Sequence, residues 1–428
     1  MYKICVPTFN RAEKLKKETL NTLIRFGVDR EKINIFVVPE EEEIYKSINP
    51  DYNIIVGVKG LILQKEFIEN YFDKGDLLLF LDDDITDFDL LGKSFDDFVM
   101  EGFKECFKQG SYIFSVYPCW NKYYREKREY CSTCLNFCIG GFYGIINRPN
   151  NENIKINCCH REDIERSIKY FIEDGIVLRF NQIGYKTKFY TNGGLGLLEN
   201  RLSDIEKDCK LFLEKYPSYG KIKERRSSAT EAKGFKNGIY EFVLKKIIAT
   251  PKPQIIFQFN IPSNTFFSDA TASQGQRPSL FSQLEKININ YRVGNSNRLG
   301  FPKYRGCVWG ISQGRYSGII GLSKYSKNYP DLYNEIVRIG KLICPFEFTS
   351  IQMNKNLVCP PHIDKKNIGN SLLVSFGDYK GNNIIVNDLE YNTNCRPLIF
   401  NGAELEHYNT PQISGTKYSL IYFNSGLK

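Results

Sequence analysis

The sequence Cys-Pro-Pro-His-Ile-Asp at positions 359–364 decides how the second half of this 428-residue chain is interpreted. It provides His362 and Asp364, and a further histidine, His407, follows in Leu-Glu-His-Tyr. In an extended segment, residues two apart point to the same side, so His362 and Asp364 can reach one ion while Ile363 packs behind. Two imidazoles and one carboxylate on one face of a metal are typical of non-haem iron(II) in oxygenases. Spacing alone leaves open the alternative that these are unrelated surface residues.

Short predicted strands separated by Gly, Asn, Pro and Ser continue from Gln254 onward, a pattern typical of a jelly-roll barrel, also called a double-stranded β-helix. The predicted helices are Ser279–Ile287 and Asp331–Leu342, and the clearest strands are Phe346–Asn354, Ser371–Phe376, Asn383–Val386, Arg396–Phe400 and Lys417–Phe423. We therefore expect a β-rich domain over 254–428. Its metal would lie at the barrel mouth, held by His362, Asp364 and His407.

Lys417 begins one of these strands, ten positions after His407. A cation at this place is suited to pair with the far carboxylate of 2-oxoglutarate, with the Ser419 hydroxyl beside it on the same strand face. Lysine also often lies at the edge of a sheet without such a role. With the iron pattern upstream, the interpretation as a co-substrate contact is favoured.

The first half of the chain alternates predicted strands with predicted helices, which is typical of an α/β domain with a largely parallel sheet. The strands are predicted at Lys3–Pro7, Ile33–Val38, Tyr52–Val56, Leu77–Leu81 and Phe180–Tyr190, and the helices at Ala12–Phe26, Leu61–Phe72 and Ile164–Glu173. In such sheets, ligands bind outside the carboxyl ends of the strands. Two polar segments lie at such ends, Pro7-Thr8-Phe9-Asn10-Arg11 and Asp82-Asp83-Asp84.

The acidic triplet Asp82–Asp84 follows five apolar residues. Carboxylates at a strand end can hold Mg²⁺ or Mn²⁺, which prefer oxygen ligands and often share them with a diphosphate. The alternative is a solvated turn or a helix cap, since Asp is favoured in both. Further on, Gly140–Gly144 forms a glycine-rich loop, and Glu162-Asp163 opens a helix. The acidic pair either complements the helix N-terminus or supplies a base.

Composition places limits on the class of protein. The chain exceeds the usual size of a single core, so we expect two domains. No apolar run approaches the length of a membrane span, and the strand-like start at Tyr2 predicts that no signal peptide precedes the fold. Thirteen cysteines without a secretory signal are typical of reduced thiols in an intracellular protein, cytoplasmic or nuclear. A net charge of +9 is compatible with a nucleic-acid partner but does not require one.

Six of the cysteines and His160 lie close together in the sequence, at Cys119, Cys131, Cys134, Cys138, Cys158 and Cys159. They could form a zinc site, with Cys131 and Cys134 as two ligands. The later residues lack a regular paired spacing, and buried free cysteine is an ordinary core residue. Both interpretations stay open.

Leu202–Lys246 is rich in Lys and Glu and is expected to be a solvated helical segment between domains. Its basic run Lys221–Arg226 is more often a solvated helix face than a nucleic-acid arm. Thr250-Pro251-Lys252-Pro253 ends any preceding helix. The expected organisation is therefore an α/β domain over 1–200, a basic helical extension over 201–253 and a β-rich domain over 254–428.

The order of motifs over residues 2–200 resembles GT-A type (Rossmann-like) glycosyltransferases. The resemblance is carried by the Pro7–Arg11 loop, the apolar strand ending in Asp82–Asp84, the glycine loop and Glu162-Asp163. It implies contacts to a sugar nucleotide, expected to be a UDP-sugar, and to Mn(II) or Mg(II) from Thr8, Arg11, Asp82 and Asp84. It also implies that Asp163, or Glu162 in its place, deprotonates the acceptor hydroxyl. Many members have a late histidine as a further metal ligand, whereas here Thr191-Asn192-Gly193-Gly194 stands in that region, which implies weaker metal dependence.

The segment 290–424 closely resembles the TET/JBP family of nucleic-acid base dioxygenases. The resemblance is carried by Phe348–Asn354, Pro361–Gly369, Gly377–Tyr379, Phe400–Gly402, His407 and Gly415–Phe423. It implies that His362, Asp364 and His407 are the iron(II) ligands. It also implies that Lys417 and Ser419 contact 2-oxoglutarate and that Asn367 contacts a flipped base.

Two positions depart from the TET/JBP pattern. Lys417 stands where arginine is usual, and Gly381-Asn382-Asn383 replaces a double glycine. Lysine keeps the charge but loses the planar, two-pronged hydrogen bonding of arginine, so the affinity for 2-oxoglutarate is expected to differ.

Together the two resemblances imply sequential modification of a DNA base. An oxygenase of this family oxidises the methyl of 5-methylcytosine or thymine to a hydroxymethyl, and a glycosyltransferase needs a hydroxyl as acceptor. Two alternatives remain open. One is a lysyl-type protein hydroxylase and glycosyltransferase, and the other is a nucleic-acid-binding protein with one or both centres inactive. Asn367 favours the DNA-modifying pair.

Overall fold

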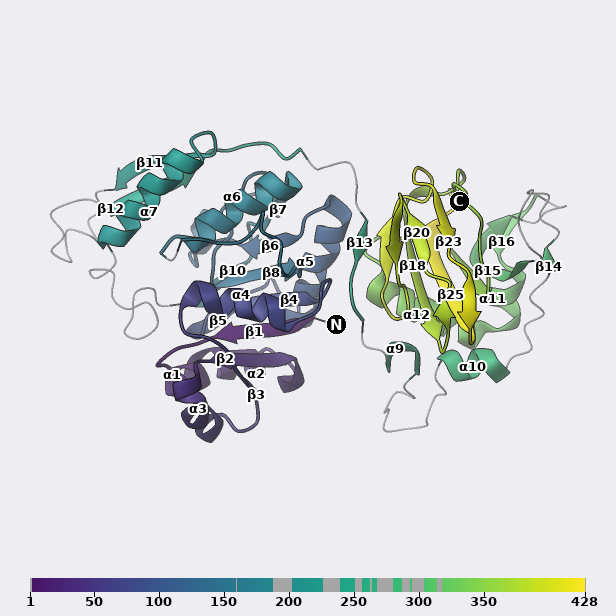
Figure 1. Cartoon of the computed structure of the whole chain (residues 1–428), viewed down its shortest axis with the longest axis horizontal. Coiled ribbons are helices and arrows are strands. Elements are labelled where there is room, and N and C mark those ends of the chain that lie inside the picture. The colour runs from purple at the N-terminus through teal and green to yellow at the C-terminus, as the bar shows by residue number, and fades with distance from the viewer. Residues whose placement is uncertain are drawn as a thin grey trace. The chain divides into compact units, whose positions relative to one another are not determined.

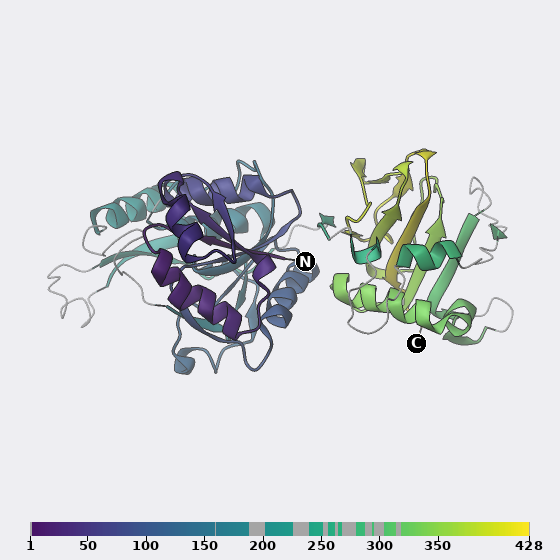
Figure 2. The ribbon, with the colours of Figure 1, turned by 90° about the horizontal axis from the view of Figure 1, so that it is seen from below.

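The computed structural model describes residues 2–158, 160–187, 202–225, 239–250, 256–261, 264–267, 280–286, 293–294, 304–313 and 318–427. The chain divides into two compact units, Tyr2–Pro253 and Gln254–Lys428 (Figures 1 and 2). We call them the N-terminal and the C-terminal unit. Among the helices of the described residues, none is long and apolar enough to cross a membrane.

The N-terminal unit is built on one mixed sheet with the strand order β3-β2-β1-β4-β8-β6-β9-β7. Its strands are β1 Lys3–Pro7, β2 Ile33–Val37, β3 Asn53–Val56, β4 Leu77–Leu81, β6 Ile113–Val116, β7 Cys131–Ser132, β8 Phe142–Ile146 and β9 Leu178–Phe180. Parallel pairing joins β3, β2, β1 and β4, and also β6 and β9. β8 runs antiparallel between β4 and β6, and β7 runs antiparallel to β9. The expected largely parallel sheet is therefore mixed.

Helices connect these strands (Figure 1). They are α1 Ala12–Leu15, α2 Asn21–Arg25, α3 Glu42–Ile48, α4 Leu61–Tyr71, α5 Phe95–Gln109 and α6 Glu162–Asp174, with a π-helical turn at Lys16–Leu20 and short 3₁₀ turns at Arg30–Lys32, Pro39–Glu41 and Lys122–Tyr124. α5 shows why its ends lie where they do. The Ser94 side chain accepts a hydrogen bond from the backbone N–H of Asp97, and Gly110 ends the helix at a φ of 81°, which glycine adopts without strain.

The two polar loops predicted to hold a ligand lie at neighbouring strand ends. β4 is fully buried, and Asp82 follows its last residue. Since β1 and β4 are parallel neighbours, the loops after them emerge at the same edge of the sheet. A small antiparallel pair, β5 Ile85–Asp89 with β10 Gly184–Thr187, adjoins this edge. The predicted strand Phe180–Tyr190 is thus interrupted after Phe180, and residues 188–196 lie outside the described part of the chain.

The segment predicted as a helical extension differs from the structure. In its described residues, 202–225 and 239–250, α7 Leu202–Lys215 is helical, whereas the basic run that follows forms β11 Gly220–Arg225, paired antiparallel with β12 Ile239–Leu244. Ile222 and Phe242 face each other across this ribbon. Together with α7 they pack on one side of α6, in a core that includes Ile168. Ile222 is the single large apolar residue of β11, so its own sequence carries little strand pattern, and its pairing with the more apolar β12 makes it a strand.

The C-terminal unit is antiparallel throughout its large sheet, of order β13-β22-β18-β25-β17-β15-β14 with β16 on β15. The strands are β13 Phe257–Gln258, β14 Val293–Gly294, β15 Tyr304–Gln313, β16 Ile320–Leu322, β17 Ser350–Lys355, β18 Ile368–Gly377, β22 Leu398–Phe400 and β25 Lys417–Asn424. Two smaller antiparallel sheets contain β19 Lys380–Gly381 with β24 Gln412–Ser414, and β21 Leu389–Tyr391 with β20 Ile384–Val386 and β23 His407–Asn409. The described helices are α9 Asn264–Phe267, α10 Leu280–Lys286, α11 Lys324–Asn328 and α12 Pro330–Ile343.

The two faces of β25 have different partners. Helix α12 lies on one face, where the Tyr422 hydroxyl donates to the carbonyl of Ile336 at 2.9 Å (Figures 1 and 2). On the other face, Ile421 packs against a core that includes Leu373 and Phe400. Because side chains alternate along a strand, Lys417 and Ser419 point to the same side as Ile421. The central strand therefore presents two polar groups on its inner face.

Candidate functional site

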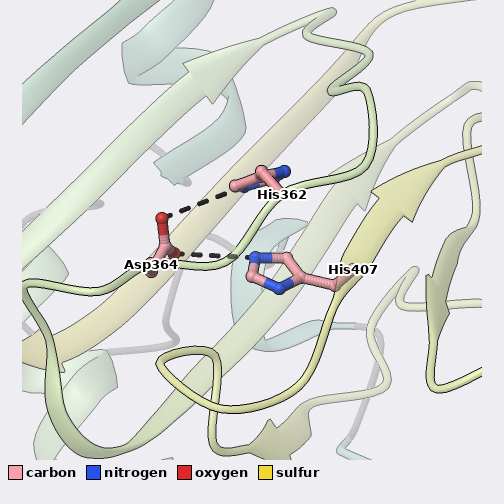
Figure 3. A group of neighbouring side chains, drawn as sticks. All are labelled: His362, Asp364 and His407. Carbon is pink, nitrogen blue, oxygen red and sulfur yellow. Dashed lines mark ion pairs between the residues drawn. The ribbon is translucent and has the colours of Figure 1, made fainter.

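His362, Asp364 and His407 lie together in the C-terminal unit (Figure 3). The His362 Nε2 atom is 3.9 Å from Asp364 Oδ1, and the His407 Nε2 atom is 3.6 Å from Asp364 Oδ2. One ligand atom from each residue lies within 4.8 Å of the others, and in the described residues no other group of three or more His, Cys, Asp or Glu does so. The sequence predicted that these three residues would lie together, and they do so in the fold.

Reciprocal backbone hydrogen bonds bring the two histidines together. The His362 N–H donates to the carbonyl of His407 at 3.1 Å, and the His407 N–H donates to that of His362 at 3.0 Å. Asp364 is fixed by its own N–H, which donates to the carbonyl of Gly402 at 2.8 Å. We expected His362 and Asp364 to lie on a strand. Instead they lie on an extended loop that meets β23 through a single bridge, because only this one pair of backbone groups is in register.

The hydrogen bonds of the imidazoles fix which nitrogen is available to a metal. The Nδ1 atom of His362 lies 2.8 Å from the carbonyl of Pro360, and that of His407 lies 2.9 Å from the carbonyl of Leu405. A carbonyl only accepts, so each Nδ1 carries a proton, and in the neutral imidazole each Nε2 has the lone pair that can bind a metal. Both Nε2 atoms are the ones that face Asp364. Two imidazole nitrogens and a carboxylate are a suitable ligand set for a divalent transition metal. The carbonyl that each Nδ1 contacts orients the imidazole, as is usual for metal-binding histidines.

Gly402 provides the space beside this cluster. A Cβ atom on Gly402 would lie 3.4 Å from the His407 ring and 3.7 Å from the Asp364 carboxylate. The His407 side chain is 8% exposed, and that of Asp364 is 34% exposed. One side of the cluster is therefore packed, and the Asp364 side is open to solvent.

Lys417 is buried without a carboxylate partner in the described part of the chain. Its Nζ donates to the backbone carbonyl of Asn382 and, at 3.1 Å, to the Asn382 Oδ1. It also lies 5.2 Å from the centre of the Tyr379 ring. Burial lowers the pKa of Lys417 to about 8, because the charged form is removed from water without a compensating anion. Lys417 is therefore suited to receive an anionic ligand.

The other two residues predicted for the oxygenase lie near this face. Ser419 is buried and is the cross-strand partner of Asn354 on one side and of Ser375 on the other. Asn367 is half-buried, its N–H donates to the carbonyl of Asp364 at 2.9 Å, and its amide lies 3.4 Å from the Ser371 hydroxyl. Asn367 therefore lies on the same loop as Asp364, a candidate metal ligand. Its proposed contact to a base stays a prediction.

The N-terminal unit contains a large cleft, with a volume of about 1360 Å³. All six residues predicted for sugar transfer line it: Thr8, Arg11, Asp82, Asp84, Glu162 and Asp163. The fold thus brings residues from the ends of β1 and β4 together with the N-terminus of α6. Their roles stay predictions, but their location on one surface agrees with a shared site.

The three aspartates have different partners. Asp83 accepts hydrogen bonds from the Thr8 hydroxyl at 2.7 Å and from the Arg11 guanidinium at 2.8 Å. Asp84 accepts from Lys14 at 2.9 Å and from the Thr187 hydroxyl. In the described residues, none of these carboxylates belongs to a group of three or more potential metal ligands. Asp83 and Asp84 are paired with cations here, and metal binding by Asp82 and Asp84 stays a prediction.

Glycine is required beside two of the acids. A Cβ atom on Gly140 would lie 2.6 Å from Glu162 Oε1, and one on Gly141 would lie 2.4 Å from Asp82 Oδ2. The carbonyl of Gly141 accepts from the N–H of Asp82 at 3.2 Å. Burial raises the pKa of Asp82 to about 6, with the other aspartates contributing in the same direction. The glycine loop therefore lets the backbone approach the acidic cluster closely.

Glu162 and Asp163 lie in different environments although they are adjacent. Glu162 is buried between two cations, with Lys65 Nζ 2.7 Å from Oε1 and the Arg166 guanidinium on Oε2. Asp163 lines the cleft, has no ion pair with any described residue, and accepts a hydrogen bond from the N–H of Ile164 at 2.9 Å. Burial raises the pKa of Asp163 above its usual range, although the nearby Arg161 opposes this. Of the two acids, Asp163 is therefore the one that no described cation holds, and its role as a base stays a prediction.

Sequence reasoning missed two residues that line the cleft, Lys65 and Tyr185, and a third, Lys14, that pairs with the cleft residue Asp84. Lys65 on α4 pairs with Glu162, and burial lowers the pKa of Lys65 to about 7. Tyr185 on β10 is buried, and its hydroxyl has no hydrogen-bond partner among the described residues. Lys14 lies one turn after the Pro7–Arg11 loop. Only Lys14 had a signal in the sequence, since it follows Arg11 by three positions on a predicted helix.

The cysteine cluster does not form a metal site among the described residues. Cys138 packs in the core beneath the main sheet, whereas Cys158 packs against α7. Cys131 and Cys134 are partly exposed, and Cys134 lies 3.3 Å from the Asn136 side chain. Cys159 lies outside the described residues. The described cysteines of this cluster form no disulfide with one another and lie in separate environments.

The geometry of the His362 cluster predicts metal binding that depends on Asp364. Asp364→Ala should weaken binding of Co(II), used as a spectroscopic probe, by roughly 100-fold or more, since the loss of even an outer partner of a metal ligand costs 10–100-fold. The matched control is His160→Ala, which removes the third histidine of the chain. Absorption titrations under anaerobic conditions measure both variants. Equal loss in both would contradict the assignment.

Neither the models of known protein families nor the curated proteins include a match to this sequence. Solved structures similar to it include NgTET1 in complex with 5mC DNA, at 16% identity over 28% of this chain and 60% of that chain, with a TM-score of 0.24. S. aureus TarS matches at 12% identity over 50% of this chain and 65% of that chain, with a TM-score of 0.35. A 2OG-Fe(II) oxygenase family protein from Burkholderia pseudomallei matches at 14% identity over 29% and 70%, with a TM-score of 0.22.

This chain therefore spans less than two thirds of the NgTET1 and TarS chains. Every one of these TM-scores is below 0.5, so the proposals below depend on the residues and distances of the chain itself.

Proposed function

We propose that the C-terminal unit is an iron(II)- and 2-oxoglutarate-dependent dioxygenase with a double-stranded β-helix fold. The observation that carries the proposal is the His362–Asp364–His407 cluster, whose two Nε2 lone pairs face one carboxylate. Iron(II) with 2-oxoglutarate supplies the oxidation of an unactivated C–H bond by O₂ when both are bound. His362, Asp364 and His407 would hold the iron, and the exposed side of the cluster would receive the substrate.

Lys417 is proposed to bind the far carboxylate of 2-oxoglutarate, with the Ser419 hydroxyl beside it. The support is a buried ammonium that has amide and carbonyl partners but no carboxylate within ion-pair distance in the described chain. A bound carboxylate would offset the cost of removing the Lys417 ammonium from water, and would hold Lys417 in its charged form. Lys417 and Ser419 share the strand face of Ile421, which packs in the same core as Phe400. The Phe400 ring in turn packs on His407 at 5.0 Å.

The N-terminal unit is proposed to be a GT-A type glycosyltransferase that uses a sugar nucleotide. The cleft is large enough for a nucleotide and an acceptor. Arg11 and Lys14 are placed to offset charge on the leaving diphosphate, exchanging their present carboxylate partners for phosphate oxygens. Asp163 would accept the proton of the acceptor hydroxyl as its oxygen attacks the anomeric carbon. Lys65 and Arg166 hold Glu162 in place beneath it.

The two activities are proposed to act in sequence on DNA. Oxidation of a base methyl, in 5-methylcytosine or thymine, would create the hydroxyl that the glycosyltransferase consumes. The base has to leave the duplex stack to reach a buried centre, and Asn367 would contact it there. The net charge of +9 is compatible with a polyanionic substrate.

Nucleoside mass spectrometry tests the proposed sequence of reactions. DNA containing 5-methylcytosine or thymine is incubated with the protein, iron(II), 2-oxoglutarate and a panel of sugar nucleotides. A hydroxymethyl base is expected without sugar nucleotide, and a glycosylated base with it. Asn367→Ala should abolish base oxidation while 2-oxoglutarate decarboxylation continues. Absence of both products, or normal DNA oxidation by this variant, would overturn the proposal.

Lys417→Met should raise the KM for 2-oxoglutarate by about ten-fold or more, since a hydrogen bond to a charged group contributes ~1.5–3 kcal/mol. The stability of the free protein should change by less than about 1 kcal/mol, because removal of a desolvated charge offsets the loss of donors to Asn382. In the wild type, the KM should rise as the pH passes about 8, where Lys417 loses its proton. Initial rates and thermal unfolding measure these effects. An unchanged KM would contradict the role.

Asp163→Asn and Glu162→Gln should fail in different ways. Asp163→Asn removes the base and should lower the rate of sugar transfer by ~100-fold or more with little change in thermal stability. The wild-type rate should fall as the pH drops through the raised pKa of Asp163. Glu162→Gln leaves two buried cations without their anion and should destabilise the unit by about 3 kcal/mol. The reverse assignment of the base would hold if only Glu162→Gln abolished transfer in folded protein.

A further inference from the structure

A cationic and aromatic segment forms part of the wall of the N-terminal cleft. It is the connection between β6 and β7, Tyr117–Tyr130, with the sequence Tyr-Pro-Cys-Trp-Asn-Lys-Tyr-Tyr-Arg-Glu-Lys-Arg-Glu-Tyr. Arg128 from this connection and Arg179 from β9 both line the cleft. The proposed sugar transfer assigns no role to either residue.

Two guanidinium groups share one aromatic ring in this wall. The Arg128 guanidinium lies 4.7 Å from the centre of the Tyr117 ring, and that of Arg179 lies 5.1 Å from the same centre. We call these three residues the arginine–tyrosine cluster. The Nε of Arg128 donates to the carbonyl of Tyr124 at 2.7 Å, and that of Arg179 donates to the Asn181 Oδ1 at 2.8 Å. These bonds orient both guanidiniums.

Neither guanidinium pairs with a carboxylate within 4.0 Å in the described part of the chain. Three other arginines of the unit, Arg125, Arg148 and Arg166, are each held by a carboxylate. Burial lowers the pKa of Arg179, and the like charge of Arg128 adds to this effect. The acidic residue of this segment that also lines the cleft, Glu129, forms no ion pair with either. Two adjacent positive charges are thus left for an external anion.

Exposed aromatic rings lie on the same connection. The Tyr123 side chain is 70% exposed and that of Tyr124 is 55% exposed. Their rings are nearly perpendicular at 5.4 Å, and the Lys127 ammonium lies 6.0 Å from the centre of the Tyr123 ring. Large exposed rings interleaved with cations match the needs of a nucleic acid strand, which presents phosphates and stackable bases together. An acidic peptide would use the cations but not the neighbouring rings.

We propose that the arginine–tyrosine cluster binds phosphates of a single-stranded polynucleotide acceptor and that Tyr123 and Tyr124 stack on its bases. The inference rests on the proposed function for the role of the cleft, and adds where the acceptor strand is held. In this arrangement the strand crosses the wall formed by β7 and β9, and the modified nucleotide enters the cleft lined by Asp163.

Fluorescence anisotropy with labelled single strands of about 12 nucleotides tests the cluster, a length within the usual range for such sites. DNA and RNA of one sequence are compared. Arg128→Gln/Arg179→Gln should weaken binding by roughly ten-fold and reduce the slope of log affinity against log salt by about 1.4, or ~0.7 for each lost phosphate contact. The matched control is Arg25→Gln, which removes an exposed arginine that lies over the Phe26 ring. It should bind like the wild type.

A second variant keeps the test valid if the loss of Arg179 impairs folding. Tyr123→Ala/Tyr124→Ala changes only exposed side chains and should weaken binding by roughly five-fold or more, since stacking contributes ~1–3 kcal/mol per base. Its salt slope should match that of the wild type. Wild-type affinity in both double variants would overturn the inference. Equal competition by polyglutamate of the same charge would also overturn it, because it would show a general polyanion surface.

Binding of UDP to the wild-type protein, measured in parallel, separates this inference from the proposed function. UDP binding without any oligonucleotide binding would overturn the inference and leave sugar transfer standing. Oligonucleotide binding that depends on the cluster, in a protein that transfers no sugar, would support the inference and overturn the proposed transferase.

Discussion

The reciprocal backbone hydrogen bonds between His362 and His407 are the constraint on which the C-terminal site depends. They join an extended loop to β23 across 45 positions of sequence. A single bridge of this kind has little stability by itself, so the flanking sheets must hold both segments in place. Gly402 supports the arrangement from the side, since its carbonyl accepts from Asp364 and it has no side chain to fill the space beside His407. The ligand geometry is thus a consequence of strand register, and the chemistry follows from it.

The sequence predicted elements where the local pattern was unambiguous. Leu77–Leu81 was expected as a strand and is β4, and the predicted strand from Lys417 differs from β25 by one residue at its end. It could not predict the bridge at His362, because pairing between distant segments depends on register that no local pattern contains. It was wrong about the described part of the basic run, Lys221–Arg225, which is a strand because it pairs with a distant segment and not because of its own pattern. Burial of Lys65 and Tyr185 likewise has no local signal, since it arises from packing between elements.

Two departures from the TET/JBP pattern are in contact with each other. Lys417 replaces the usual arginine, and Asn382 lies within the segment that replaces a double glycine. The Lys417 Nζ donates to both the carbonyl and the side-chain oxygen of Asn382. A lysine is a point charge on a flexible stem and lacks the rigid fork of arginine. Asn382 supplies the fixed acceptors that orient the ammonium, and its φ of 52° is one that asparagine tolerates better than most residues. The two departures are therefore linked, since the residue at one of them holds the side chain at the other.

Uncompensated charge distinguishes the candidate binding groups from the structural ones in both units. Glu162 and Asp83 are buried with cationic partners, so a ligand would have to break existing ion pairs to use them. Among the described residues, Lys417 is buried with neutral hydrogen-bond partners, and Asp163 faces a cleft and has no ion pair. Burial of a charge without a counter-charge costs stability, which a fold would not retain unless a ligand or a reaction used it. This criterion favours the proposed assignment of the base to Asp163 over Glu162, although the two are neighbours in the chain and share one helix terminus.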